Sequence, residues 1–178
     1  MVNPRFITLA AFVVAVAATR LLPHAPNFTP IAAMALFGGA HFANRPTAFA
    51  LPLAAMLLSD LVIGLHAGMP FVYGAFAMIV GLGLLIRNRR TPLAIAGAAL
   101  TGSIGFFLLT NFGTWLTGGL YPLTGGGLLA AYTAAIPYFA HTLTGDAFYT
   151  AVLFGGFALA QRVFPLLREE PAPAPAHG

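Results

Sequence analysis

The sequence predicts an all-α integral membrane protein, with six transmembrane helices, cytoplasmic N- and C-termini, and an outer or re-entrant helix before the last span. Composition is the first observation behind this prediction. Of the 178 residues, 59% are hydrophobic and 7% are charged, and the mean hydropathy is +0.87, whereas an average soluble chain is roughly 25% charged. Eight basic and four acidic side chains are too few to cover a water-soluble body of this size. The solvent of this protein is therefore a bilayer.

The apolar runs are the second observation. A membrane helix needs about 20 predominantly apolar residues. Six runs are candidates, roughly residues 6–22, 29–43, 47–65, 70–86, 92–116 and 146–167. The second run is only about 15 residues long, so we expect it to be tilted or broken. A seventh run, 128–143, is also short and contains Pro137.

The third observation is the distribution of basic residues, which are all arginine and which collect at cytoplasmic helix ends. Six spans with the N-terminus inside leave only Arg20 outside. The seven arginines on the cytoplasmic side are then Arg5, Arg45, Arg87, Arg89, Arg90, Arg162 and Arg168. If the run 128–143 also crossed, only five of the eight would lie inside. We therefore expect this run to lie on the outer face or to be re-entrant, packed against protein.

The two ends of the chain carry separate predictions. Residues 1–167 form a single transmembrane domain, and residues 168–178, in which Pro and Ala alternate, form a disordered cytoplasmic tail. The first run also resembles a short signal peptide, because Arg5 precedes an apolar stretch with an A-x-A sequence at 15–17. Arg20 and the polar segment after it favour a retained helix, with cleavage as the alternative.

Several chemistries are disfavoured by the sequence. The chain has no cysteine, which excludes disulfides, thiolate metal sites and thiol catalysis. The outer histidines His24, His66 and His141 lack the spacing of a metal site. The string GSIG at 102–105 does not match G-x-S-x-G and suits close helix packing, and no Gly-rich nucleotide-binding loop occurs. We expect no enzymatic activity, cofactor, metal or nucleic-acid partner.

Polar side chains gather in the predicted outer half, and Asp60 is the most informative of them. It lies about 8 Å inside the estimated outer end of its span, where a lipid-facing carboxylate would cost about 2 to 3 kcal/mol. Asp60 must therefore face the bundle. Two interpretations stay open: a structural ion pair with Arg20 or a capping contact, and an acid that contacts a ligand or titrates during transport.

Other outer polar residues share this ambiguity. Asn111 can recognise a polar ligand group or hydrogen-bond a neighbouring helix, and Trp115 can belong to an interfacial belt or stack on a ligand. The predicted substrate-binding residues are Asn27, Asp60, Asn111, Trp115, Tyr138, His141 and Asp146. Glycine clusters on either side of Tyr121 predict that residues 117–145 form a lid.

Four strings in the chain support a resemblance: residues 21–32, residues 57–61 with Gly64 and His66, residues 110–115, and residues 145–146 with 153–155. They resemble a family of small, uncharacterised bacterial integral membrane proteins over nearly the whole chain except the tail. That resemblance implies a bacterial cytoplasmic (inner) membrane location and supplies no function.

More distantly, the chain resembles the substrate-binding S-components of energy-coupling factor (ECF) vitamin transporters, partly through the S-D-x-x-x-G string that ends at Gly64. This resemblance implies six spans, cytoplasmic termini and a binding pocket open to the outer side. It also implies an A-x-x-x-A face on the first helix, here Ala11 and Ala15, which contacts a transmembrane coupling subunit. A solitary cobalamin-transporting group is the nearest functional suggestion, although its better-known members use a cysteine toward cobalt and this chain has none.

The resulting functional hypothesis is a membrane-embedded uptake subunit that captures a small vitamin-like molecule from the outer side. Its partners would be the bilayer, the ligand and, where uptake is driven by ATP, a transmembrane coupling subunit with ATPases. One alternative is an ion- or proton-coupled carrier in which Asp60 titrates and Arg20 gates it. Another is a non-transporting scaffold or assembly factor that uses the small-residue face at Ala11 and Ala15.

Overall fold

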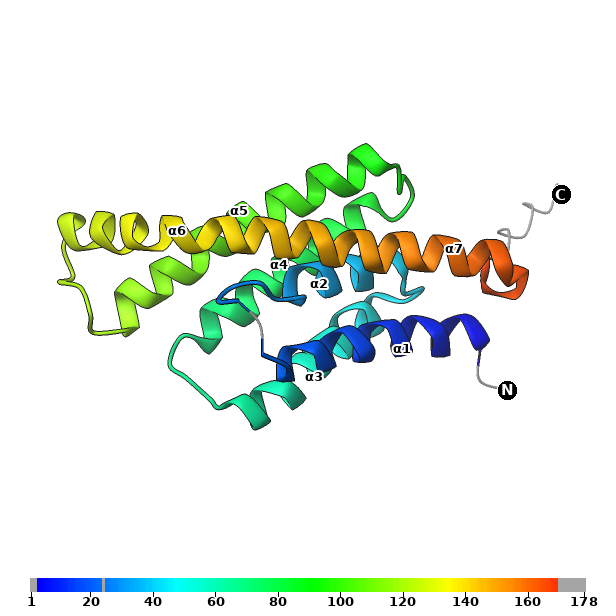
Figure 1. The fold of residues 1–178 in the computed structure, drawn as a ribbon, viewed down its shortest axis with the longest axis horizontal. Coiled ribbons are helices and arrows are strands. Elements are labelled where there is room, and N and C mark those ends of the chain that lie inside the picture. The colour runs from blue at the N-terminus through cyan, green and yellow to red at the C-terminus, as the bar shows by residue number, and fades with distance from the viewer. Residues whose placement is uncertain (1–2, 24, 170–178) are drawn as a thin grey trace, which may run out of the picture.

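The computed structural model describes residues 3–23 and 25–169, and this part of the chain is helical without a strand. The α-helices are α1 (Pro4–Ala18), α2 (Ile31–His41), α3 (Arg45–Ile63), α4 (Met69–Ile86), α5 (Pro92–Thr117), α6 (Gly125–Thr150) and α7 (Gly156–Val163). Short 3-10 turns cover Thr19–Leu21 and Pro165–Leu167, and a π-turn, Ala151–Gly155, joins α6 to α7. Figure 1 shows α6 and α7 running together along the longest axis of the molecule.

Local sequence sets several of the helix starts. The side chains of Asn44, Thr91 and Thr124 each accept a hydrogen bond from a backbone N–H in the first turn of the following helix. Such capping satisfies donors that have no partner inside the helix. Pro92 follows directly in α5, where its missing N–H costs nothing.

Five segments in the described part of the chain are long and apolar enough to cross a membrane. They are Pro4–Leu21, Arg45–Ile63, Met69–Ile86, Pro92–Thr117 and Gly125–Val163. The remaining apolar helix, α2, has 11 residues, which is about 16 Å and too short for a hydrocarbon core of about 30 Å. The second apolar run is thus a shorter helix than the sequence predicts.

Helix α2 forms the centre of the core. All 11 of its residues are buried, and it contacts α1, α3, α4, α5 and α6 (Figure 1). Its approach to α4 depends on two glycines: a Cβ added at Gly39 would lie 2.2 Å from the Val80 carbonyl oxygen, and one at Gly83 would lie 2.4 Å from that of Leu36. Small residues allow this close backbone contact between membrane helices.

The separate outer or re-entrant helix is a wrong prediction. Residues 128–143 belong to α6, which continues through Pro137, the π-turn and α7 as one helical segment of 39 residues. A proline inside a helix removes one hydrogen bond and strains the preceding turn. Leaving the helix at membrane depth would expose several unpaired backbone groups, which costs more. The segment predicted to form a lid is mostly helical, since only its residues 118–124 lie outside a helix.

Arginine-bearing segments meet at one end of the bundle, here called the arginine end. Arg5 Nη1, in the first turn of α1, donates to the Leu167 carbonyl at 2.8 Å. Arg87, directly after α4, donates to the Ala43 carbonyl at 3.0 Å, in the turn between α2 and α3. The start of α1, the end of α2, the α4–α5 turn and the end of α7 therefore lie together, and successive segments alternate in direction (Figure 1).

Candidate functional site

Two aspartates are buried in the bundle, and the first belongs to a fully paired cluster. Arg20 Nη2 lies 2.8 Å from Asp60 Oδ1, and the Tyr73 hydroxyl donates to Asp60 Oδ2 at 2.9 Å. Arg20 also donates to the Ser59 hydroxyl and, at 3.4 Å, to the Met56 carbonyl. We call this group the Arg20–Asp60 cluster. It ties the end of the first span to α3 and α4, and each of its charges has an opposite charge.

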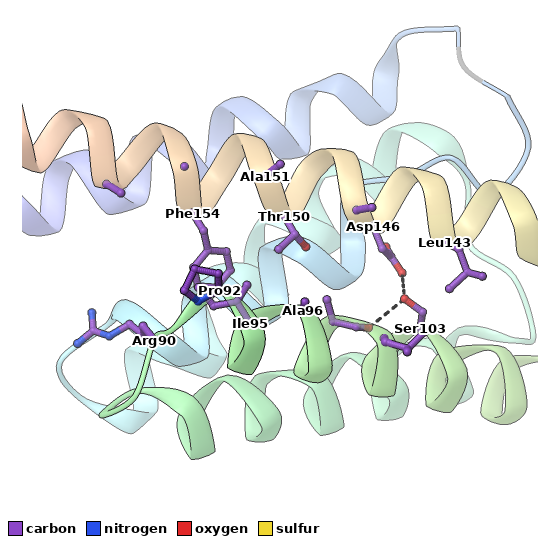
Figure 2. A pocket seen from close by; sticks show the side chains of 15 residues that line it. Arg90, Pro92, Ile95, Ala96, Ser103, Leu143, Asp146, Thr150, Ala151 and Phe154 are labelled. Atoms are coloured by element: carbon purple, nitrogen blue, oxygen red, sulfur yellow. Dashed lines mark hydrogen bonds between the residues drawn. The ribbon is translucent and has the colours of Figure 1, made fainter.

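The second aspartate, Asp146 in α6, has a different partner. Its Oδ2 accepts a hydrogen bond of 2.5 Å from the Ser103 hydroxyl of α5, whose oxygen also lies 3.0 Å from the Ala99 carbonyl (Figure 2). Asp146 is 4% exposed and Ser103 is 1% exposed. Asp146 makes no ion pair with the described residues. It is therefore a buried carboxylate held by a neutral donor.

Asp146 borders a small polar pocket near the end of the bundle opposite the arginine end. This opposite-end pocket has a volume of about 140 Å³. Its lining residues are Arg20, Asn27, Thr29, Ile31, Ala32, His66, Val72, Phe106, Thr142 and Asp146. Asn27 and His66 are exposed, so they mark its mouth.

The loop over this pocket is held against α6. Asn27 has a left-handed backbone with φ of 63°, which asparagine adopts more readily than other non-glycine residues. Beside it, the Pro26 carbonyl lies 3.1 Å from Nδ1 of His141. A Cβ added at Gly145 would lie 3.1 Å from Cα of Phe28. The Gly145-Asp146 pair thus combines a close backbone contact with the buried acid.

Asp146 also borders a larger cavity, a crevice of about 650 Å³ between α5 and the α6–α7 segment (Figure 2). We call it the α5–α7 crevice. It is lined by Arg90, Pro92, Ile95, Ala96, Ala99, Leu100, Ser103, Leu143, Asp146, Ala147, Thr150, Ala151, Phe154, Gly155 and Ala158. Its walls are largely apolar, with Asp146 and Ser103 at one end and Arg90 at the other. Asp146 alone lines both the pocket and the crevice.

Several predicted site residues lie away from both cavities. Asn111 Nδ2 donates to the Phe107 carbonyl of its own helix at 2.8 Å. Trp115 Nε1 donates to the Pro122 carbonyl at 2.9 Å and so supports the loop after α5. Tyr138 is 47% exposed. Asp60 reaches the opposite-end pocket only through Arg20, and Asn27 and Asp146 line it directly.

The structure adds residues that the sequence analysis did not select. The GSIG string predicts close helix packing around Ser103, although a hydroxyl near the middle of an apolar span is also a candidate partner for a buried acid. Nothing in the sequence distinguishes Thr150 and Arg90 from the other threonines and arginines of the chain. Among the described residues, no group of three or more His, Asp or Glu side chains could hold a metal ion. His24 lies outside the described residues.

The chain matches a protein family whose function is unknown. The model of a family of unknown function, DUF6580, matches residues 1–168, so the chain belongs to this family. No curated protein and no solved structure matches the chain.

Proposed function

We propose that this protein is a multi-pass uptake protein of the bacterial inner membrane that captures a small amphipathic molecule from the side opposite the arginine end. The single observation that carries the proposal is the position of Asp146. It is the one residue shared by the linings of the opposite-end pocket and the α5–α7 crevice. Both cavities adjoin this side chain, and we infer that they form one path, which Asp146 and Ser103 interrupt.

The state of Asp146 supports a functional role. Ionisable groups in membrane segments are costly and generally mark ligand or ion pathways unless a partner neutralises them. Asp60 has such a partner in Arg20, whereas Asp146 has a serine hydroxyl. A ligand that brings a donor or a positive charge to Asp146 would improve the electrostatics of the site.

The proposed topology has six membrane segments, with the short α2 as the second and with the arginine end in the cytoplasm. Alternating helix directions and the positive-inside rule support this orientation. The chain has no cysteine, so single-cysteine variants test it cleanly. Leu120→Cys should react with an impermeant thiol reagent in intact cells, and Asn88→Cys should react only after permeabilisation. The reverse pattern would overturn the orientation.

The pocket size bears on how capture proceeds. A volume of about 140 Å³ is below the roughly 300 to 1,000 Å³ of typical ligand sites. Capture of a vitamin-sized molecule therefore requires the loop at 25–30 to move away from α6. The distant likeness to S-components fits this role, and the exposed Ala11 and Ala15 on α1 offer the face for a coupling subunit.

A second candidate function is an ion- or proton-coupled carrier. The absence of a cationic partner for Asp146 among the described residues favours it, and Asp146 takes the coupling role instead of Asp60. Uptake into ATPase-free proteoliposomes that depends on a pH gradient, and that Asp146→Asn abolishes, would select this mechanism over an ATPase-driven one.

The test of capture is mass spectrometry of small molecules that co-purify with the protein. We expect a compound that is enriched with the wild-type protein and depleted from Asp146→Asn. Thr144→Ala is the matched control, because Thr144 is exposed and bonds only within its own helix. A compound retained equally by all three proteins, or none in any of them, would contradict binding at Asp146.

A further inference from the structure

The α5–α7 crevice has the dimensions of one bilayer leaflet. From Leu143 to Ala158 its α6–α7 wall covers 15 residue steps, or about 22 Å. Half of a bilayer of about 40 to 45 Å, headgroup regions included, is about 20 to 22 Å. Exposed small residues, including Ala96, Ala147, Ala151 and Ala158, line its side. The crevice therefore opens laterally toward the acyl chains around the bundle.

The end of the crevice nearest the arginine end carries surplus positive charge. Glu169 lies 2.7 Å from Nη2 of Arg5 and 2.7 Å from Nη2 of Arg90. Two guanidinium groups thus share one carboxylate among the described residues. A neighbouring cavity of about 290 Å³ is lined in part by Glu169 and Gln161. It adjoins the crevice, because both are lined by Arg90, Ile95, Phe154 and Ala158. Anionic groups are attracted to such a site.

The wall of the crevice has two features that are typical of binding sites. Thr150 is 8% exposed, and its hydroxyl has no hydrogen-bond partner among the described residues. Figure 2 shows it between Asp146 and Phe154, on the side of α6 that faces the crevice. Directly after it comes the π-turn, an irregularity that often occurs at functional sites, and Ala151, Phe154 and Gly155 of this turn line the crevice.

We propose that the α5–α7 crevice holds one acyl chain of an anionic membrane phospholipid whose head group contacts Arg90. The length of the crevice matches one leaflet, its walls are apolar, and its mouth is cationic. The cytoplasmic leaflet, where the arginine end is proposed to lie, is the leaflet rich in anionic lipid. The seated lipid covers the lateral side of the Asp146–Ser103 pair, and it does so whether or not the protein carries out uptake.

Gly155 provides the main test variant. A Cβ at Gly155 would meet nothing within 4 Å, so Gly155→Leu fills the crevice without a backbone clash. Gly97→Leu is the matched control, because Gly97 is also helical, its added Cβ also meets nothing within 4 Å, and it does not line the crevice. Ala151→Leu is a second filling variant, and equal thermal unfolding temperatures identify the variants that remain folded.

The measurement is native mass spectrometry of purified protein titrated with phosphatidylglycerol, with phosphatidylcholine of the same chains, or with palmitate. The wild-type protein and Gly97→Leu should bind one phosphatidylglycerol in preference to the other two. Gly155→Leu and Ala151→Leu should bind it about tenfold more weakly. Arg90→Gln should reduce the preference over phosphatidylcholine about fivefold.

Three results would overturn the proposal. Unchanged binding in both filling variants would place the lipid elsewhere. Equal binding of phosphatidylglycerol and phosphatidylcholine by the wild-type protein would show that the cationic mouth does not select an anionic head group. Stronger binding of palmitate than of phosphatidylglycerol would identify a free fatty acid as the occupant.

Discussion

Asp60 and Asp146 are the same residue type, buried to the same degree, at 3% and 4% exposure, yet their surroundings differ in charge and in space. Asp60 has an arginine and a tyrosine as partners and lines neither the opposite-end pocket nor the α5–α7 crevice. Asp146 has a serine as its partner and lies between these two cavities. Equal burial of two acids in membrane helices therefore does not predict equal roles. On our proposal, the partners and the adjoining space separate a structural acid, Asp60, from a functional one, Asp146.

The largest expected effect is on the Arg20–Asp60 cluster. Arg20→Met leaves the buried carboxylate without its positive partner, which should lower the free energy of unfolding by about 3 to 5 kcal/mol. The measurement is unfolding in mixed micelles with increasing SDS. Adding Asp60→Leu to Arg20→Met should recover much of the loss, because no charge then remains unpaired. If Arg20→Met alone is as stable as the wild-type protein, the Arg20–Asp60 cluster is not structural.

A smaller effect is expected at Tyr73. Tyr73→Phe removes the hydroxyl that donates to Asp60 but keeps the ring and the Arg20 ion pair. Hydrogen bonds to charged groups contribute about 1.5 to 3 kcal/mol, so we expect a loss of about 2 kcal/mol in the same unfolding assay. The partly buried Tyr132, which donates to the Leu108 carbonyl, provides Tyr132→Phe as a control for a neutral acceptor. An equal loss of stability in both variants would show that the charge of Asp60 does not strengthen the hydrogen bond from Tyr73.

The smallest stability effect is expected at the second aspartate. Asp146→Asn keeps an oxygen that accepts from Ser103 and breaks no ion pair, so the free energy of unfolding should change by about 1 kcal/mol or less. Its effect should appear in ligand capture instead. A destabilisation as large as that of Arg20→Met would make Asp146 structural and erase the difference between the two acids.

Part of this arrangement is predictable from sequence. Hydropathy locates the long helices, because a span must be apolar over its whole length. The need of a buried carboxylate for a partner gives Arg20 or a capping contact as the structural alternatives for Asp60, and the ion pair with Arg20 is present. Both arguments depend on local sequence or on a single strong energetic requirement.

Other parts depend on tertiary packing and were not predictable. The sequence suggested a break near Pro137, but backbone hydrogen bonding keeps α6 continuous. Asn111 and Trp115 have the chemistry of ligand contacts, but the helix and loop around them use their donors. The α5–α7 crevice lies where α5 and the α6–α7 segment diverge (Figure 1). No residue pattern in either helix predicts the angle between them.

Chemical access to Asp146 from the end opposite the arginine end is the most direct measurement of the proposed path. In the cysteine-free chain, Asp146→Cys should react with a small, impermeant thiol reagent added to the side opposite the arginine end, as the exposed Leu120→Cys should. Ala98→Cys, which is buried and lines neither cavity, should stay unmodified. Labelling at position 120 without labelling at 146 would show that Asp146 has no access from that side and would contradict the proposed path.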